Sequence, residues 1–280
     1  MVLGTDLTGK MVVVTGAGGI LCGMFARTLA RAGAAVALLD INLEAAEETA
    51  RDIREAGGTA AAYGVDVMDK DMLESVHARV LARLGPCDIL INGAGGNQAR
   101  ANTSKEYFEM GDIEADVATF FDMEYKGVQG VLDLNFLGGF LTCQVFAKDM
   151  VGREGCNIIN ISSASAARPL TRIPVYSGAV AALSNFTQWL AVHFAKAGIR
   201  VNAIAPGFFV TRQNEGLLYE EDGKPAARTA KVLAATPMGR FGRPEELNGA
   251  LMFLLNNEAA GFITGIILPV DGGFSAYSGV

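Results

Sequence analysis

The chain has 280 residues, half of them hydrophobic, so it is long enough to bury one large core, and a single domain is expected. The formal net charge is −7 and no basic run stands out, which argues against a nucleic-acid partner. An acidic protein can still bind an anion where a site gathers a few arginines.

Short apolar runs alternate with helical spacing along the first third of the chain. Residues 10–15 predict a buried strand that ends in glycines, and residues 20–32 have the apolar spacing of a helix. The alternation continues through strands at 35–40, 59–65 and 88–92 and helices at 43–56 and 70–84. Such alternation is typical of βαβ units and predicts a parallel sheet covered on both faces.

The same alternation resumes in the second half of the chain. It predicts strands at 156–161, 200–204 and 266–269 and helices at 175–197 and 245–255. We therefore expect one α/β domain over residues 1–280, a Rossmann-type doubly wound parallel sheet of about seven strands with helices on both faces.

Two long segments interrupt this rhythm, at about 95–127 and 208–236. Both follow the carboxyl end of a predicted strand, the edge at which ligands bind in open α/β sheets. Loops of this length in a compact domain are usually functional or disordered. We interpret both as substrate-site loops, with disorder as the alternative.

The N-terminal segment lacks a charged region followed by a long apolar run, and no stretch approaches 18 uninterrupted apolar residues. We expect no signal peptide, no membrane contact and a cytoplasmic location. The cysteines show no Cys-x-x-Cys spacing, which predicts buried free thiols in a reducing compartment, and no metal site is expected. They are Cys22, Cys87, Cys143 and Cys156.

The stretch TGAGGILCG (15–23) follows the first strand and opens the first helix. Glycines let a backbone approach a pyrophosphate closely, and the helix N-terminus supplies N–H groups. A tight turn without a ligand is the alternative. Asp40 ends the second strand, where a carboxylate can accept from both hydroxyls of an adenosine ribose and repel a 2′-phosphate. This predicts NAD(H) rather than NADP, with a turn or helix-cap role as the alternative for Asp40.

Two further segments fit a dinucleotide. Asp66 follows the third strand and could accept from the adenine amino group, and residues 92–95 are small where the cofactor must pass close to the backbone. The residues predicted to bind the cofactor at this end are Gly16, Gly18, Gly19, Ile20, Asp40, Asp66, Val67, Asn92, Ala94 and Gly95.

At this point the chain resembles the short-chain dehydrogenase/reductase family, from about Leu7 to Gly273. Each matching motif is modest, but their order and spacing together are highly specific. The resemblance implies an NAD(H)-dependent enzyme that interconverts a ketone and a secondary alcohol. The matching motifs are TGAGG (15–19), Asp40, DV (66–67), NGAG (92–95), LDLN (132–135), NISS (160–163), Tyr176, RVNAIAPG (200–207) and VDGG (270–273).

The resemblance also implies catalytic roles. Ser163 corresponds to the serine that hydrogen-bonds the substrate oxygen, whereas its neighbour Ser162 is assigned a structural role. Tyr176 corresponds to the general acid/base. Asn135 corresponds to an asparagine that holds a water in a proton relay, the alternative being a helix residue that bonds backbone. Pro206, Gly207 and Phe209 correspond to the loop beside the nicotinamide.

The family's catalytic lysine is replaced by Val180. In the family, this ammonium binds the nicotinamide ribose and lowers the tyrosine pKa. Losing about three pKa units costs about 4 kcal/mol, roughly a thousandfold, in steps that need tyrosinate. Ketone reduction, which needs the neutral tyrosine, should slow less. The chain could be a knock-out that still binds cofactor, a natural variant with altered chemistry, or a binding protein without turnover, and neither Lys126 nor Lys148 is expected to substitute.

The segment ARPLTRIPVY (167–176) must border the reacting carbon, because it lies between Ser163 and Tyr176. Arg168 and Arg172 could pair with a substrate carboxylate, with salt bridges across a subunit contact as the alternative. Asn97 and Gln213, in the two long segments, could bind substrate hydroxyls.

The glycine turn departs from the common family pattern, because Gly19 comes early and Cys22 stands where a last glycine is common. This variant, with residues 185–209 and the ending DGGFSAYSGV, resembles the D-mannonate oxidoreductase (fructuronate reductase) branch. That branch implies reduction of D-fructuronate by NADH, and the family implies a homotetramer. The alternatives are a catalytically silent NAD(H)-binding sensor or scaffold and, less favoured, an interaction protein that uses no nucleotide.

Overall fold

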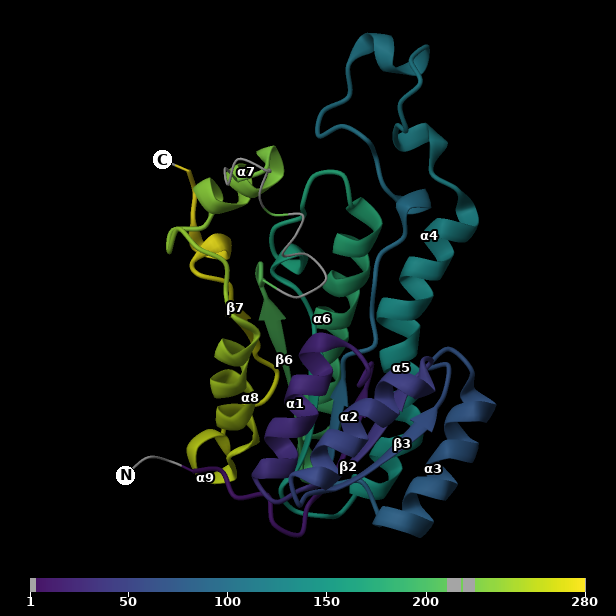
Figure 1. Cartoon of the computed structure of the whole chain (residues 1–280), viewed down its shortest axis with the longest axis vertical. Coiled ribbons are helices and arrows are strands. Elements are labelled where there is room, and N and C mark those ends of the chain that lie inside the picture. The colour runs from purple at the N-terminus through teal and green to yellow at the C-terminus, as the bar shows by residue number, and fades with distance from the viewer. Residues whose placement is uncertain (1–3, 211–217, 219–224, 280) are drawn as a thin grey trace.

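The computed structural model of the chain describes residues 4–210, 218 and 225–279. Seven parallel strands form one sheet in the order β3-β2-β1-β4-β5-β6-β7 (Figure 1). The predicted α/β architecture is therefore confirmed. The strands are β1 (Met11–Thr15), β2 (Ala35–Asp40), β3 (Thr59–Gly64), β4 (Ile89–Asn92), β5 (Cys156–Ile161), β6 (Ile199–Pro206) and β7 (Ile267–Val270).

The central strands are apolar throughout because helices cover both of their faces. Alternate residues of a strand point to opposite sides of the sheet. Val12 and Val14 of β1 pack with α1, α2 and α8, whereas Val13 packs on the other face with α3, α5 and α6. The helices are α1 (Ile20–Arg31), α2 (Leu43–Glu55), α3 (Lys70–Leu84), α4 (Tyr125–Leu132), α5 (Gly138–Phe146), α6 (Pro174–Phe194), α7 (Ala227–Ala235), α8 (Leu247–Leu255) and α9 (Asn257–Ala260).

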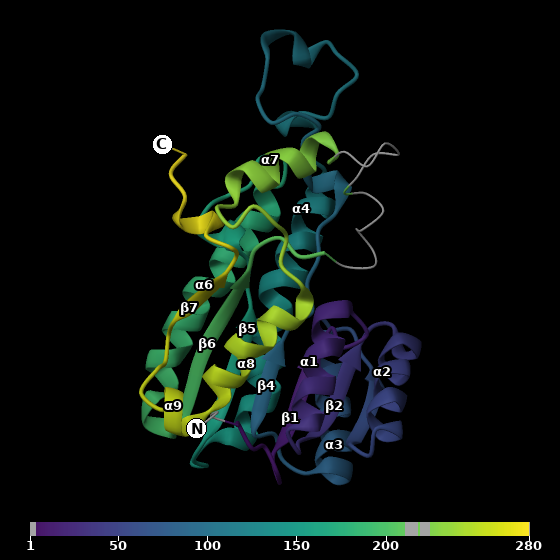
Figure 2. The same cartoon turned by 60° about the vertical axis from the view of Figure 1, so that its left-hand side comes forward.

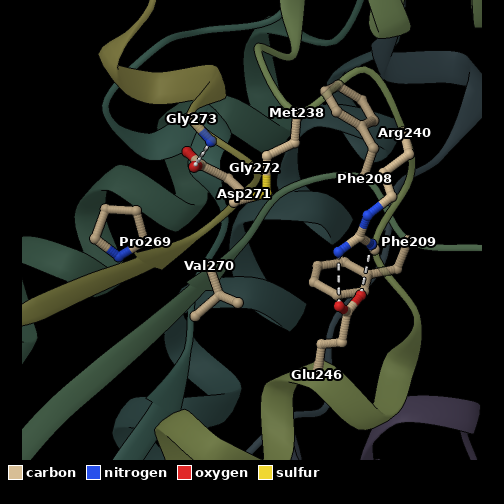
Figure 3. Close-up of a pocket in the computed structure, with 11 residues that line it drawn as sticks. Phe208, Phe209, Met238, Arg240, Glu246, Pro269, Val270, Asp271, Gly272 and Gly273 are labelled. Carbon is tan, nitrogen blue, oxygen red and sulfur yellow. Dashed lines mark hydrogen bonds and ion pairs between the residues drawn. The ribbon is translucent and has the colours of Figure 1, made fainter.

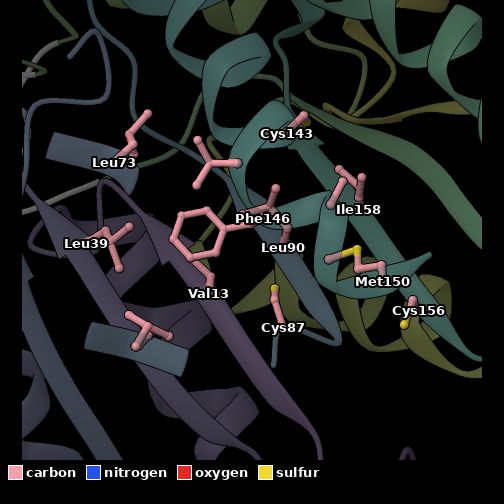
Figure 4. Close-up of a cluster of buried hydrophobic side chains, with 14 of the residues drawn as sticks. Val13, Leu39, Leu73, Cys87, Leu90, Cys143, Phe146, Met150, Cys156 and Ile158 are labelled. Atoms are coloured by element: carbon pink, nitrogen blue, oxygen red, sulfur yellow. The ribbon is translucent and has the colours of Figure 1, made fainter. Parts of the chain in front are cut away.

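The larger core cluster lies beneath α5. Phe146 is fully buried over the sheet, near Val13 and Leu90 (Figure 4). Three of the four cysteines, Cys87, Cys143 and Cys156, belong to the same cluster, and all four are free and buried, as predicted. Burial raises the pKa of the Cys143 thiol to about 12, so this thiol is uncharged and packs as a small apolar group.

Two helices differ from the sequence-based expectation. The first long segment was expected to run to residue 127, but α4 already begins at Tyr125. The second contains α7, which the prediction missed because its alanine-rich sequence is short and has polar residues on either side. Alanine has the highest helix propensity, so the composition of this segment did carry a helix signal.

The helical run Tyr125–Met150 is continuous through a π-helical turn at Asp133–Leu137. In the described part of the chain it is the one helix that is long and apolar enough, by length and composition, to cross a membrane. Core helices of soluble proteins pass the same test, and Val131, Val145 and Phe146 of this run are buried against the rest of the fold.

Residues 96–124 form an arm that extends beyond the carboxyl edge of the sheet (Figures 1 and 2). Its two sides are joined by a hydrogen bond from the Ser104 N–H to the Ala118 carbonyl, 2.8 Å long. Lys105 ties the tip together through 2.6 Å contacts with Glu109 and the buried Asp112. The helix α7 lies at the same end of the molecule, so described parts of both predicted excursions lie at the carboxyl edge of the sheet, and their role in substrate binding stays a prediction.

Candidate active site

The turn between β1 and α1 is packed so closely that it requires glycine. Gly16 has φ of 67°, and a Cβ there would lie 2.9 Å from the Gly93 carbonyl oxygen. A Cβ on Gly18 would lie 2.8 Å from the Cβ of Ala45 in α2. Gly19 is the N-cap of α1, so the free N–H groups of this helix face the same space as the glycine turn. The turn thus has the close backbone packing and free N–H groups that a phosphate cradle needs, and phosphate binding there stays a prediction.

A cavity of about 530 Å³ lies in front of this turn at the carboxyl edge of the sheet. Asp40 stands in its wall and accepts hydrogen bonds from the N–H groups of Gly18 (2.9 Å) and Asn42 (2.8 Å). The turn role considered for Asp40 is therefore real, and the carboxylate also faces the cavity. Most of the predicted cofactor residues line this cavity, namely Gly16, Gly18, Gly19, Ile20, Asp40, Asp66, Val67, Ala94 and Gly95.

Cys22 and Gly93 form a complementary pair beneath the cavity. A Cβ on Gly93 would lie only 2.1 Å from the Cys22 sulfur, so the thiol occupies space that a side chain at residue 93 would need. This packing explains how a cysteine replaces the glycine common at that point of the turn. Burial raises the pKa of Cys22 to about 12, which keeps the thiol neutral beside the cradle.

Asn92 is brought to the end of β4, but its side chain does not line the cavity. Its amide donates to Oδ1 of Asn160 (2.9 Å) and to the Cys143 sulfur (3.2 Å). Asn160 in turn donates to Oγ1 of Thr187 at 2.8 Å. This buried chain of hydrogen bonds ties β4, β5 and α6 together, and cofactor binding by the Asn92 side chain stays a prediction.

Tyr176 lies in the first turn of α6 and is half-buried among Ala101, Val131 and Ala179. Burial raises the pKa of Tyr176 above its ordinary value, and a hydrogen bond with the Ser163 hydroxyl acts in the opposite direction. Ser163 Oγ accepts from the N–H (3.2 Å) and the hydroxyl (3.0 Å) of Ser165. Because both donors occupy its lone pairs, the Ser163 proton is free to be donated to Tyr176 or to a ligand oxygen.

Asn135 lies in the π-helical turn between α4 and α5. Its amide donates to the carbonyls of Gly96 (2.7 Å) and Val131 (2.8 Å), and its Oδ1 accepts from the Gly96 N–H (3.0 Å). Both N–H groups are therefore used, and one Oδ1 lone pair remains. The side chain braces the loop after β4, which matches the backbone-bonding alternative, and its role in a proton relay stays a prediction.

Val180 is 2% exposed, one turn after Tyr176 in α6. Its carbonyl accepts from the hydroxyls of Ser162 (3.2 Å) and Ser184 (2.9 Å), which gives Ser162 the structural role expected of it. Among the described residues that line the 530 Å³ cavity there is neither lysine nor arginine. Lys126 and Lys148 are exposed and lie outside that lining, so neither takes the place of the family's ammonium.

A second cavity, of about 400 Å³, is lined by residues 170–173, the loop that leads into α6 and Tyr176. Its wall also includes Asn102, which directly follows Ala101, a residue that packs against the tyrosine. The remaining wall comes from the base of the arm, the loop before α6, and α7. The residues involved are Thr103, Glu106, Leu170, Thr171, Arg172, Phe208, Ala227, Arg228, Lys231, Val232, Ala235 and Phe274.

Only one of the residues predicted to bind substrate, Arg172, lines the second cavity among those that the structure describes. Arg172 lines the second cavity, whereas the Arg168 guanidinium donates to the Tyr277 carbonyl at 2.7 Å and lies outside the lining. Asn97 also lies outside it and donates to Oδ1 of Asn102 at 3.0 Å. Gln213 falls outside the described residues. Sequence reasoning missed Arg228 and Lys231, because their segment was interpreted as a loop; their spacing on an alanine-rich helix was the available signal.

A third cavity, of about 350 Å³, lies between the end of β6 and β7 (Figure 3). Phe209 is in its wall, so the predicted nicotinamide loop of Pro206, Gly207 and Phe209 lies beside this cavity rather than in the lining of the 530 Å³ cavity. Arg240 forms two 2.8 Å bonds with Glu246, and this pairing lowers the pKa of Glu246 to about 2. Arg240 is therefore already neutralised by its own chain.

Comparison with known proteins agrees with this geometry. The profile of a family described as "Enoyl-(Acyl carrier protein) reductase" matches residues 19–275. An uncharacterized oxidoreductase of Haemophilus influenzae is 54% identical, over 98% of this chain and 96% of its own length. A cis-4-hydroxycyclohexanecarboxylate dehydrogenase of Sinomonas cyclohexanicum is 34% identical, over 98% of this chain and all of its own length.

Among solved structures, a proposed D-mannonate oxidoreductase from Haemophilus influenza, crystallised with bound NAD, is similar with a TM-score of 0.95. It is 53% identical, and the match covers 98% of each chain. The seven-stranded parallel sheet, the glycine cradle and the Ser163–Tyr176 pair agree with these matches. The chain therefore belongs to the short-chain dehydrogenase/reductase family of oxidoreductases.

Proposed function

We propose that the chain is an NAD(H)-dependent oxidoreductase that interconverts a ketone and a secondary alcohol on a sugar acid, with D-fructuronate and D-mannonate as the best candidates. One observation carries the proposal: Tyr176, hydrogen-bonded to Ser163, follows within three residues a loop, 170–173, that lines an arginine-containing cavity, and the same edge of the sheet holds the glycine turn. The NAD bound to a relative of 53% identity and the carboxylate substrate named for another relative support it.

When bound, NADH would supply the hydride that reduces the ketone. The Ser163 hydroxyl would donate a hydrogen bond to the ketone oxygen, and Tyr176 would deliver the proton that converts this oxygen to a hydroxyl. In the reverse direction Tyr176 would remove that proton, which requires tyrosinate. Because burial raises the pKa of Tyr176 and Val180 supplies no charge, oxidation should be more impaired than reduction.

We test the substrate class by following NADH consumption with D-fructuronate and with the neutral ketose D-fructose. The chain and its Val180→Lys variant are compared at equal cofactor saturation. D-fructuronate should be reduced faster than D-fructose by the lysine variant, and slowly by the parent chain. If the lysine variant binds NADH but reduces neither sugar, the proposed substrate class is wrong.

A second candidate is an NAD(H)-binding protein without turnover, which Val180 favours. It shares the cradle and the cavity with the first candidate, so NADH binding alone does not distinguish them. Turnover by the parent chain, with any sugar acid or polyol, would exclude this candidate.

Asp40→Ala should weaken NADH binding about tenfold or more, because hydrogen bonds to a charged carboxylate contribute about 1.5–3 kcal/mol. NADPH binding should strengthen, since the repulsion of a 2′-phosphate is removed. Fluorescence titration with both nucleotides measures this. Glu44→Ala is the matched control, because Glu44 is an exposed carboxylate in the first turn of α2, outside the cavity lining. If the two variants change nucleotide binding equally, Asp40 affects binding only through the net negative charge of the protein and not through contact with the ribose.

We also propose that the chain is cytoplasmic and forms a homotetramer. Large apolar side chains that are exposed on α4 and α6 support assembly, since contiguous apolar surface usually marks an interface. Tyr125 is 78% exposed and Val192 is 80% exposed. Sedimentation analysis of the purified chain tests the assembly, and a monomer at micromolar concentration would refute it.

A further inference from the structure

The second cavity has a wall that is more positive than the rest of this acidic protein. Among the residues that the structure describes, three cationic side chains line it, Arg172, Arg228 and Lys231, against the one carboxylate of Glu106. The whole chain carries a net charge of −7, so a cavity with excess positive charge is a local departure that requires a reason. An anionic ligand is the simplest one.

One of the three cations is already neutralised. Lys231 Nζ lies 2.7 Å from Oε1 of Glu106, which joins α7 to the base of the arm. This ion pair closes one side of the cavity and leaves Arg172 and Arg228 without a carboxylate partner among the residues that the structure describes.

Arg172 is held in an unusual conformation. Its φ is 72°, in the left-handed region that bulky side chains rarely adopt, and such strain is concentrated at ligand sites. The Thr103 N–H donates to the Arg172 carbonyl (3.0 Å), and the Arg172 Nε donates back to the Thr103 carbonyl (3.2 Å). This clamp fixes the guanidinium by its Nε, and within the described part of the chain no hydrogen bond uses its terminal nitrogens.

Arg228 is the second arginine that lines the cavity. It lies in the first turn of α7, three residues before Lys231, so both side chains project from one face of the helix toward the cavity. Within the described ranges Arg228 makes no ion pair. Arg240 of the third cavity, in contrast, donates two hydrogen bonds to the Glu246 carboxylate. An arginine in this cavity without a carboxylate partner among the described residues is suited to a ligand.

We propose that Arg228 and Arg172 together form the subsite that binds the carboxylate of the substrate, while Arg168 has no part in it. The carboxylate would accept hydrogen bonds from the terminal nitrogens of both guanidinium groups. Asn102, Thr103 and Thr171 in the same wall offer polar groups for neighbouring hydroxyls. The choice of a sugar acid as ligand rests on the proposed function, whereas the preference for a carboxylate rests on the cavity.

The test titrates D-mannonate into the NADH complex of the chain by calorimetry. Both molecules are reduced, so no turnover occurs and Val180 does not interfere. D-mannitol, which has CH₂OH in place of the carboxylate, is the neutral comparison. Arg228→Gln and Arg172→Gln should each raise the Kd for D-mannonate about tenfold or more and leave D-mannitol and NADH binding unchanged. Arg168→Gln is the matched control and should bind D-mannonate as the parent does.

D-mannonate binding by Arg228→Gln that equals that of the parent would overturn the subsite, and so would a parent that does not prefer D-mannonate to D-mannitol. If the parent binds neither, the same comparison is made with cis-4-hydroxycyclohexanecarboxylate and its neutral hydroxymethyl counterpart; no preference there refutes the subsite. The two proposals can also fail separately. If the Val180→Lys variant reduces no sugar acid but the parent still prefers a carboxylate and loses this preference in Arg228→Gln, the subsite stands and the proposed substrate is rejected.

Discussion

Replacing Val180 with lysine should raise the rate of alcohol oxidation about a thousandfold near neutral pH. Oxidation needs tyrosinate, and burial raises the pKa of Tyr176 above its ordinary value, while Val180, one helical turn later, supplies no charge. An ammonium one helical turn away would favour the charged form and lower this pKa. Ketone reduction should gain less, because neutral tyrosine is already the required form.

The oxidation rate of the parent chain should increase with pH, because oxidation requires the deprotonated form of Tyr176. With a raised pKa, the tyrosinate fraction of the parent should increase about tenfold per pH unit through the whole neutral and mildly alkaline range. Its oxidation rate should therefore climb without a plateau, while the lysine variant should reach a plateau at lower pH. D-mannonate oxidation followed by NADH formation measures both profiles.

Val180→Met is the matched control for size, because it lengthens the side chain at this buried position without adding charge. A gain in the lysine variant alone would identify charge as the cause. Comparable neutral-pH rates for parent and lysine variant would show that Tyr176 is activated in another way.

Removal of the Tyr176 hydroxyl should have the second largest effect. In the Val180→Lys background, Tyr176→Phe should lower the rate in both directions by about 10²- to 10⁴-fold, the usual contribution of a positioned acid/base. The ring keeps its packing against Ala101, Val131 and Ala179, so NADH affinity and thermal stability should be nearly unchanged. The alkaline rise in oxidation should also disappear, because its titrating group is gone.

Tyr277→Phe is the control for loss of a phenol near the same end of the molecule, since Tyr277 meets Arg168 only through its carbonyl. It should leave the rate unchanged. If Tyr176→Phe retains the pH dependence, another group transfers the proton and the assignment of Tyr176 is wrong.

The sequence by itself determined the architecture and the cofactor end of the site. Parallel strands buried on both faces are apolar throughout, so each strand was visible as a run, and the glycine turns and helix spacing separated them. Asp40 and the glycines of residues 16–19 were found because their function depends on local backbone geometry. The Ser163–Tyr176 pair was found through the resemblance to the family, because its two members stand at the spacing that the family's motifs have.

Only the tertiary structure decided which side chains face the second cavity. Arg168 and Arg172 look alike in sequence, but the left-handed backbone at Arg172 and its clamp to Thr103 direct one toward the cavity, while the other bonds the C-terminal segment. Arg228 and Arg172 line one cavity only because the fold brings α7 and the loop before α6 together. Cys22 fits only because Gly93 leaves space for it. Such pairings join distant parts of the chain, and local periodicity carries no information about them, since they arise when the sheet closes and its loops pack together.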